Sequence, residues 1–124
     1  KRIVEMEIKK TGKLFSFCCV APLIIKKKSK QEIQKFENIG ADIGLLFQVA
    51  DDLIDSKGSL LVAGKKTRKD KIKGKATLIS LLGHKNTIKY NNKLKLKIFK
   101  KLNKFGKKSQ DLKNTINYIA NRIK

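Results

Sequence analysis

The chain has 124 residues, of which 40% are hydrophobic, and its 31 basic and 10 acidic residues give a net charge of +21. This length fits one small domain, and the apolar content is sufficient for a core, which argues against a disordered protein. The longest apolar stretch, residues 14–25, is too short to span a bilayer and lacks the form and place of a signal peptide.

The two cysteines exclude further classes of protein. Cys18 and Cys19 are adjacent, and neighbouring cysteines do not normally form an unstrained disulfide. Together with the one histidine, His84, they cannot complete a structural zinc site. We therefore expect reduced, buried thiols in a cytoplasmic protein.

The positive charge has two explanations. It can serve an anionic partner, such as nucleic acid, a membrane surface or a phosphorylated ligand. It can also reflect composition drift, because only three of the 31 basic residues are arginines and isoleucine and asparagine are abundant. Proteins that read nucleic acids tend to use arginine for bidentate contacts. The composition therefore favours drift.

Apolar residues recur three and four positions apart along most of the chain, which predicts an all-helical fold. Residues 1–27 should form one helix, or two pieces meeting at Thr11–Gly12, where glycine marks a bend or a close backbone approach. Residues 14–25 are apolar on nearly every side and should be central in a helical bundle. Because no helix-start signal precedes residue 1, we expect the chain to begin inside an element.

A capping box at Ser29–Glu32 should start the next helix, which runs from Lys30 to about Asp55. Residues 56–76 are rich in glycine and cations and should form a loop, or a short helix and a loop. A short helix closed by Gly83, an amphipathic helix closed by Gly106 and a last helix capped by Ser109 should follow. The residues expected to point inward in the last two helices are Ile88, Leu94 or Leu96, Ile98, Phe99, Leu102, Leu112, Ile116, Ile119 and Ile123.

Three carboxylates, Asp51, Asp52 and Asp55, lie at the end of the helix that the capping box starts. Residues three and four apart share a helix face, so Asp51 and Asp55 lie together, beside Gln48, with Asp52 to one side. Gly44, one turn lower, leaves room for something to lie against the helix. Like charges one turn apart repel, and the helix dipole disfavours anions at this end. A bound Mg²⁺, which takes oxygen ligands and shares itself with substrate phosphates, would reverse that penalty. The alternative is a solvated acidic helix end.

Cations lie on both sides of these acids in the sequence. Lys65 and Lys75 each follow a glycine, which lets the backbone approach an anion, and lysine suits phosphate. Lys10, Thr11 and Gly12 combine a cation, a hydroxyl and a helix break. Taken alone, the loop is more simply a solvated basic surface, residues 10–12 a bend, and His84 a structural residue. Beside the carboxylates, the lysines predict a Mg²⁺–diphosphate site.

These segments, in this order, resemble the C-terminal half of the trans-isoprenyl diphosphate synthases, the farnesyl/geranyl diphosphate synthase family of polyprenyl synthetases. KTG at residues 10–12, GLLFQVADDLID at 44–55, GKKTRKDKIKGKAT at 64–77 and NYIANRIK at 117–124 carry the resemblance. It implies an all-α helical bundle around a central cavity, the isoprenoid synthase fold. Residues 1–124 would be the C-terminal part of a single domain whose N-terminal half is absent.

The resemblance also implies a reaction, the head-to-tail condensation of an allylic diphosphate with isopentenyl diphosphate. Asp51, Asp52 and Asp55 would bind Mg²⁺ on the allylic diphosphate, and fixed cations would lower the barrier as the diphosphate leaves. The other implied roles are diphosphate binding by Lys10, Lys65 and Lys75, oxygen dipoles toward the allylic cation from Thr11 and Gln48, packing on the isopentenyl substrate by Phe47, and closure over its diphosphate by Arg122 and Lys124.

The chain departs from the family pattern in one large respect. The first aspartate-rich motif and the arginine-bearing isopentenyl site, both of the N-terminal half, are absent, so we expect the isolated segment to be inactive. The full-length enzyme would be a cytoplasmic homodimer without a membrane span. Two rivals stay open: an inactive relative that binds diphosphates or a partner, and a basic helical module that binds nucleic acid.

Overall fold

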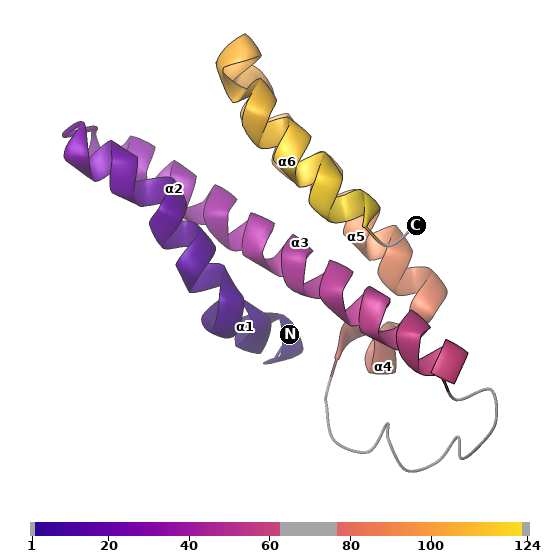
Figure 1. The fold of residues 1–124 in the computed structure, drawn as a ribbon. Helices are drawn as coiled ribbons and strands as arrows, with labels where there is room; N and C mark the ends of the chain where they lie inside the picture. Colours follow the sequence, from indigo (N-terminus) through magenta and orange to yellow (C-terminus); the bar gives the residue numbers. More distant parts are fainter. Residues whose placement is uncertain (1, 63–76, 123–124) are drawn as a thin grey trace.

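A computed structural model of the chain describes residues 2–62 and 77–122. The elements in these two ranges are all helical, which confirms the predicted fold class: α1 (Arg2–Glu7), η1 (Ile8–Gly12), α2 (Lys13–Ile25), α3 (Lys30–Val62), α4 (Leu78–Leu82), α5 (His84–Leu102), η2 (Asn103–Ser109) and α6 (Gln110–Asn121). Helix α3 runs the length of the molecule, with α1 and α2 on one side and α5 and α6 on the other (Figure 1).

The first predicted helix is interrupted where Thr11–Gly12 suggested. A short π-helical segment, η1, joins α1 to α2. Glycines allow this arm to lie directly on α3: a Cβ placed on Gly44 would lie 2.5 Å from the Cα of Gly12, and one on Gly40 would lie 2.5 Å from the Cα of Ser16. The room left by Gly44 is therefore filled by the chain itself.

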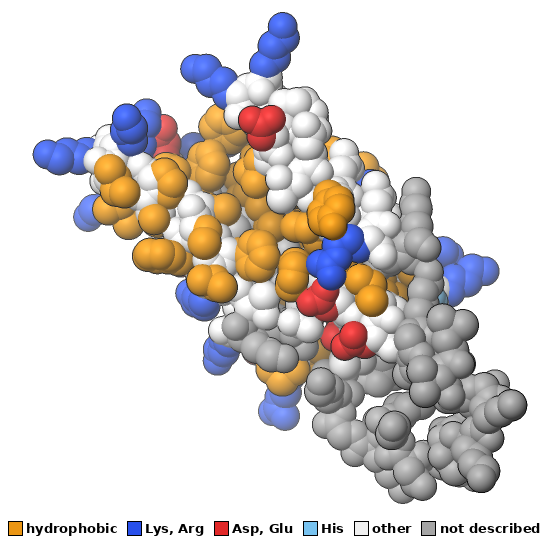
Figure 2. All heavy atoms as spheres, viewed as in Figure 1, with side chains coloured by type: hydrophobic (Ala, Val, Ile, Leu, Met, Phe, Trp, Pro, Cys, Tyr) orange, Lys and Arg blue, Asp and Glu red, His pale blue; other side chains and the backbone are white. Residues whose placement is uncertain are grey.

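Helix α2 is not central, contrary to prediction. Its large apolar side chains at Leu14, Phe17 and Ile25 are 65%, 66% and 79% exposed. Figure 2 shows hydrophobic side chains gathered on this side of the molecule. One edge of α2 packs on α3, where the hydroxyl of buried Ser16 donates to the carbonyl oxygen of Glu37 at 3.0 Å. The described part of the chain has no layer of helices beyond α2 to cover the remaining apolar side chains.

The cysteines on α2 are free, as predicted, but their expected burial is wrong for Cys18, which is exposed. Cys19 is half-buried. Burial raises the pKa of the Cys19 thiol, and the neighbouring Cys18 adds to that effect. The helical periodicity turns consecutive residues about 100° apart, so the two thiols point to different surroundings.

Helix α3 begins with the predicted capping box. Ser29 Oγ accepts from the Glu32 backbone N–H at 3.3 Å, and a Glu32 carboxylate oxygen accepts from the Ser29 backbone N–H at 3.2 Å. The helix continues to Val62, past the predicted end at Asp55. The predicted helix end is therefore wrong. Of the two alternatives for residues 56–76, residues 56–62 are helical, as a continuation of α3, and residues 63–76 lie outside the described residues.

The core lies between α3, α5 and α6. Its fully buried side chains include Leu46, Leu53, Ile98, Leu102 and Ile116. Leu94 is buried and Leu96 is 63% exposed, so of these alternatives Leu94 faces inward. Thr87 and Asn91, one turn apart on α5, are also fully buried. Their polar side chains gave no reason to predict this burial from the sequence.

The short connections follow the predicted signals with one exception. Gly83 ends α4 with φ of 76°, and Gly106 interrupts the chain before α6 with φ of 54°, both in the left-handed region that favours glycine. Ser109 precedes α6, but its hydroxyl does not cap that helix. It donates instead to the carbonyl oxygens of Leu102 and Gly106, at 3.1 and 2.8 Å.

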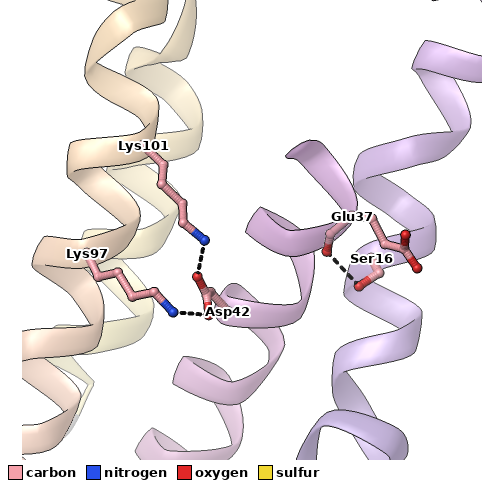
Figure 3. A network of polar contacts seen from close by, with 5 residues as sticks. All are labelled: Ser16, Glu37, Asp42, Lys97 and Lys101. Atoms are coloured by element: carbon pink, nitrogen blue, oxygen red, sulfur yellow. Dashed lines mark hydrogen bonds and ion pairs between the residues drawn. The ribbon is translucent and has the colours of Figure 1, made fainter. Parts of the chain in front are cut away.

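A carboxylate joins α3 to α5. Asp42, which is 13% exposed, accepts from the ammonium groups of Lys97 at 2.9 Å and Lys101 at 2.6 Å (Figure 3). Lys101 also lines a pocket of about 140 Å³, together with Lys35, Asn38, Ile39 and Lys104. No helix in the described ranges is long and apolar enough to cross a membrane.

Candidate functional site

Three side chains from two predicted motifs form a hydrogen-bonded line. The Thr11 hydroxyl, on η1, donates to Gln48 Oε1 on α3 at 3.0 Å, and Gln48 Nε2 donates to Asp52 Oδ1 at 3.2 Å. Gln48 and Asp52 are one turn apart, so they share a face of α3. The amide thereby receives at its oxygen and donates from its nitrogen, which fixes its orientation. The first motif and the carboxylates therefore meet in space, as the sequence predicted.

Asp51 has a different partner, from the C-terminal end of the chain. Its Oδ1 accepts from Arg122 Nη2, at the end of α6, at 3.1 Å. The guanidinium of Arg122 also lies 5.4 Å from the centroid of the Phe47 ring. Phe47 in turn lies against Phe15 of α2, with ring centroids 5.4 Å apart. Arg122 is thus close to two of the predicted site residues, although the sequence assigned it to a ligand.

The predicted site residues are only partly gathered in the described structure. Six of them form two groups of contacts. One group is Thr11, Gln48 and Asp52, and the other is Asp51, Arg122 and Phe47. Asp55 is exposed, one turn beyond Asp51. Lys65, Lys75 and Lys124 lie outside the described residues, as does the side chain of Lys10. The pocket beside Lys101 is not the predicted cavity, because its nearest lining residue on α3, Ile39, is roughly 18 Å along the helix from Asp51.

The carboxylates do not form a complete metal cluster within the described ranges, where no three acidic, histidine or cysteine side chains converge suitably. Asp51 and Asp52 are oriented by Arg122 and Gln48 respectively. Their oxygens are nevertheless the hard donors that Mg²⁺ prefers, and Mg²⁺ usually completes its coordination with water and substrate phosphates. The donor set therefore fits a Mg²⁺ ion shared with a diphosphate, and it does not fit a self-sufficient protein site.

Sequence reasoning missed two features of this region. The apolar run from residue 14 to residue 25 gives Phe15 no separate role, although its position four residues after Thr11 places it on the same helical face. The ion pair between Asp51 and Arg122 joins residues 71 positions apart. Spacing alone carries no signal for such a distant pair.

The comparisons with known proteins decide the family. The family model described as polyprenyl synthetase matches residues 1–119. The chain belongs to the polyprenyl synthetase family. It is 36% identical over 118 residues to geranylgeranyl pyrophosphate synthase 4 of Arabidopsis thaliana, covering 94% of this chain and 32% of that protein. It is 32% identical over 120 residues to farnesyl diphosphate synthase of Micrococcus luteus, covering 97% and 41%.

A solved structure shows the same fold. The geranyltransferase of Helicobacter pylori 26695 superposes with a TM-score of 0.70 at 22% identity, over 98% of this chain and 38% of that one. The prediction of an isoprenoid synthase fold is therefore confirmed. The chain spans 32% to 41% of the length of these three proteins. The family assignment does not favour a nucleic-acid-binding module.

Proposed function

We propose that the protein acts as a short-chain prenyltransferase that condenses an allylic diphosphate with isopentenyl diphosphate head-to-tail. Family membership and relatives named as geranylgeranyl and farnesyl diphosphate synthases support this reaction class. The observation that carries the proposal is the hydrogen-bonded line from Thr11 through Gln48 to Asp52. It unites a hydroxyl, an amide and a carboxylate from two motifs that the condensation would use together.

The carboxylates would hold the metal in this proposal. Asp51, Asp52 and Asp55 would bind Mg²⁺, which when bound neutralises charge on the leaving diphosphate. Gln48 holds one oxygen of Asp52 in place through its amide nitrogen, and so preorganises that carboxylate. Asp51 and Asp55 are one turn apart and can present oxygens to the same ligand.

The uncharged polar groups would act on the allylic cation. Thr11 and Gln48 would present oxygen dipoles to it, and their mutual hydrogen bond keeps both oxygens at the same end of the bundle. Phe47 would pack against the isopentenyl chain, supported by Phe15. Dipoles that are already oriented need no reorganisation when charge develops, which lowers the barrier.

The remaining cations would bind the two diphosphates. Lys10, Lys65 and Lys75 would neutralise the leaving group, and Arg122 and Lys124 would close over isopentenyl diphosphate. Fixed positive charge favours the transition state because the diphosphate gains negative charge as the carbon–oxygen bond breaks. We further propose that residues 1–124 form the C-terminal part of one domain, and that the full-length protein is a cytoplasmic homodimer.

The experiment that tests the function uses the full-length protein encoded by the gene. With Mg²⁺, an allylic diphosphate and radiolabelled isopentenyl diphosphate, it should release a longer prenyl diphosphate, detected by chromatography. Gln48→Leu should reduce turnover by about tenfold to a hundredfold, because it removes both the oxygen dipole and the partner of Asp52. Gln34→Leu, a change on the exposed start of the same helix, serves as control.

Two results would contradict the proposal. Absence of product with every allylic chain length from five to twenty carbons would refute the prenyltransferase assignment. Detectable condensation by the 124-residue chain alone would refute our expectation that this segment is inactive without a first aspartate-rich motif.

A further inference from the structure

Arg122 contacts two residues, Asp51 and Phe47, that would contact ligands in the proposed function. Its guanidinium donates to Asp51 Oδ1 at 3.1 Å and lies 5.4 Å from the Phe47 ring centroid. Asp51 is a proposed metal ligand, and Phe47 a proposed contact of the isopentenyl chain. One side chain at the end of α6 therefore contacts both residues.

The ion pair between Arg122 and Asp51 is weak enough to be replaced by other partners. The side chains of Arg122 and Asp51 are 32% and 34% exposed, so water and salt compete with their attraction. Exposed ion pairs of this kind shift an equilibrium by only about two- to fivefold. The guanidinium faces one carboxylate oxygen, and a divalent cation at the same carboxylate would meet a positive charge nearby. Arg122 and a metal ion therefore compete for Asp51.

A diphosphate offers Arg122 a better partner than Asp51 does. The planar guanidinium matches phosphate oxygens with two parallel hydrogen bonds, whereas here Nη2 makes a single bond to Asp51. Moving from the carboxylate to a phosphate also keeps both groups paired, because Asp51 gains the metal as it loses the arginine. Neither charge is left without a counter-ion during the exchange.

We propose that Arg122 is a displaceable counter-ion that holds Asp51 and covers Phe47 until a metal–diphosphate ligand arrives, and then transfers to the diphosphate. The inference rests on the proposed function, since it takes Asp51 as a metal ligand. It departs from that function in one respect, because it pairs Arg122 with the metal-bound diphosphate and not with that of isopentenyl diphosphate. It makes Arg122 a positioning residue that disfavours metal binding alone and favours binding of metal and diphosphate together. The site thereby selects the complex over the free ion.

The test measures binding to the full-length protein with Mn²⁺ and inorganic pyrophosphate as probes, at 0.15 M salt, and binding at this site is the part that Asp51→Asn removes. Mn²⁺ shares the oxygen preference of Mg²⁺, and its free fraction is read by electron paramagnetic resonance. Arg122→Gln should bind Mn²⁺ alone about two- to fivefold more tightly. With saturating Mn²⁺, the same variant should bind pyrophosphate about tenfold more weakly, because a charge-assisted hydrogen-bond pair is lost.

A matched control separates this exchange from the effect of removing any positive charge. Lys113→Gln removes one charge from the same helix, roughly 13 Å from Arg122 along α6, which exceeds the Debye length at this salt concentration. It should change both affinities by less than twofold. Arg122→Lys, which keeps the charge but not the planar fork, should recover only part of the pyrophosphate affinity.

The outcomes separate a failure of the proposed Arg122 exchange from a failure of the proposed metal–diphosphate site. Mn²⁺ binding that is lost in Asp51→Asn but equal in the wild type and Arg122→Gln would overturn the exchange while leaving the metal site intact. Equal effects of Arg122→Gln and Lys113→Gln would also overturn it. Failure of Mn²⁺ and pyrophosphate to bind any of these proteins would refute the proposed metal–diphosphate site, and the inference with it.

Discussion

The two sides of α3 are packed by different means. Toward α5 and α6, branched side chains such as Ile98, Leu102 and Ile116 are fully buried. Toward η1 and α2, the contact depends on Gly44 and Gly40, where the backbones approach so closely that no Cβ fits, while Leu14 and Phe17 stay exposed. One side is held by interdigitated side chains, and the other by close backbone contact.

The difference shows that apolar composition does not by itself place a helix in a core. Helix α2 is more apolar than α5, yet α5 has the buried face. A helix with a one-sided stripe buries that stripe against a single partner, whereas a helix that is apolar all round needs neighbours on several sides. Among the described residues, α2 has α3 along one edge and η1 at its start.

The largest expected effect contrasts a leucine from each side. Leu102→Ala, on α5, should lower the free energy of unfolding by about 2–5 kcal/mol, because it leaves a cavity in the core. Leu14→Ala, on α2, should change it by at most about 0.5 kcal/mol, since the side chain is already exposed. Urea denaturation followed by circular dichroism measures both. Similar losses would mean that the two sides contribute alike.

The close contact on the α2 side can be broken with one methyl group. Gly40→Ala should destabilise the protein by about 1–3 kcal/mol, because the added Cβ meets the backbone of Ser16 and cannot be relieved by a side-chain rotation. Asn38→Ala, an exposed change two residues earlier, should be neutral or stabilising through helix propensity. If both variants gain stability in the same urea experiment, the helices are not in tight contact.

Helix α5 carries buried polar atoms without a hydrogen-bond partner among the described residues, at His84 and Asn91. The side-chain amide of Asn91 is fully buried, and neither its nitrogen nor its oxygen has a partner in the described structure. Asn91→Leu, similar in size, should raise the free energy of unfolding by about 1 kcal/mol, since it removes an unsatisfied polar group. Exposed Asn92→Leu should show no such gain. A loss at position 91 would indicate that the amide is satisfied.

The smallest expected effect concerns the capping box and pH. Hydrogen bonds from Ser29, first its backbone N–H and then its hydroxyl, lower the pKa of Glu32. A lowered folded-state pKa contributes stability above the unfolded value of about 4.3 that is lost as the pH falls through the folded value. Thermal melts should therefore show Glu32→Gln less stable than the wild type at pH 7 and equal to it in acid. Glu5→Gln is the control, and a difference that persists below pH 3 would contradict this origin.

The sequence predicted most helices because their signals are local. The capping box at Ser29, glycine at positions 83 and 106, and the stripe through Leu94, Ile98 and Leu102 each act within a few residues. It failed where the outcome depends on distant partners. The exposure of α2 depends on which helices pack against it. The Ser109 hydroxyl donates to the carbonyl oxygens of Leu102 and Gly106 and does not cap α6, which depends on how those residues pack around it.

The candidate site divides in the same way. Periodicity put Gln48 beside Asp51 and Asp55 with Asp52 to one side, whereas its amide binds Asp52 and Asp51 binds Arg122. Motif order put Thr11 near the carboxylates, and its hydroxyl does reach Gln48. The partner of Asp51 could not be read from the sequence, because Arg122 reaches it from the far end of the chain. Its assigned diphosphate role stays a prediction, as do those of Lys10, Lys65, Lys75 and Lys124.

The Asp42 contact has a consequence for behaviour in salt. One carboxylate between the ammonium groups of Lys97 and Lys101 leaves a net positive charge where α3 meets α5, in a chain of net charge +21. The attraction acts over less than 3 Å, whereas the repulsion among the many lysines acts over longer distances and is screened first, with a Debye length of about 10 Å at 0.1 M. Moderate ionic strength should therefore strengthen this fold, and dilution into pure water should loosen it.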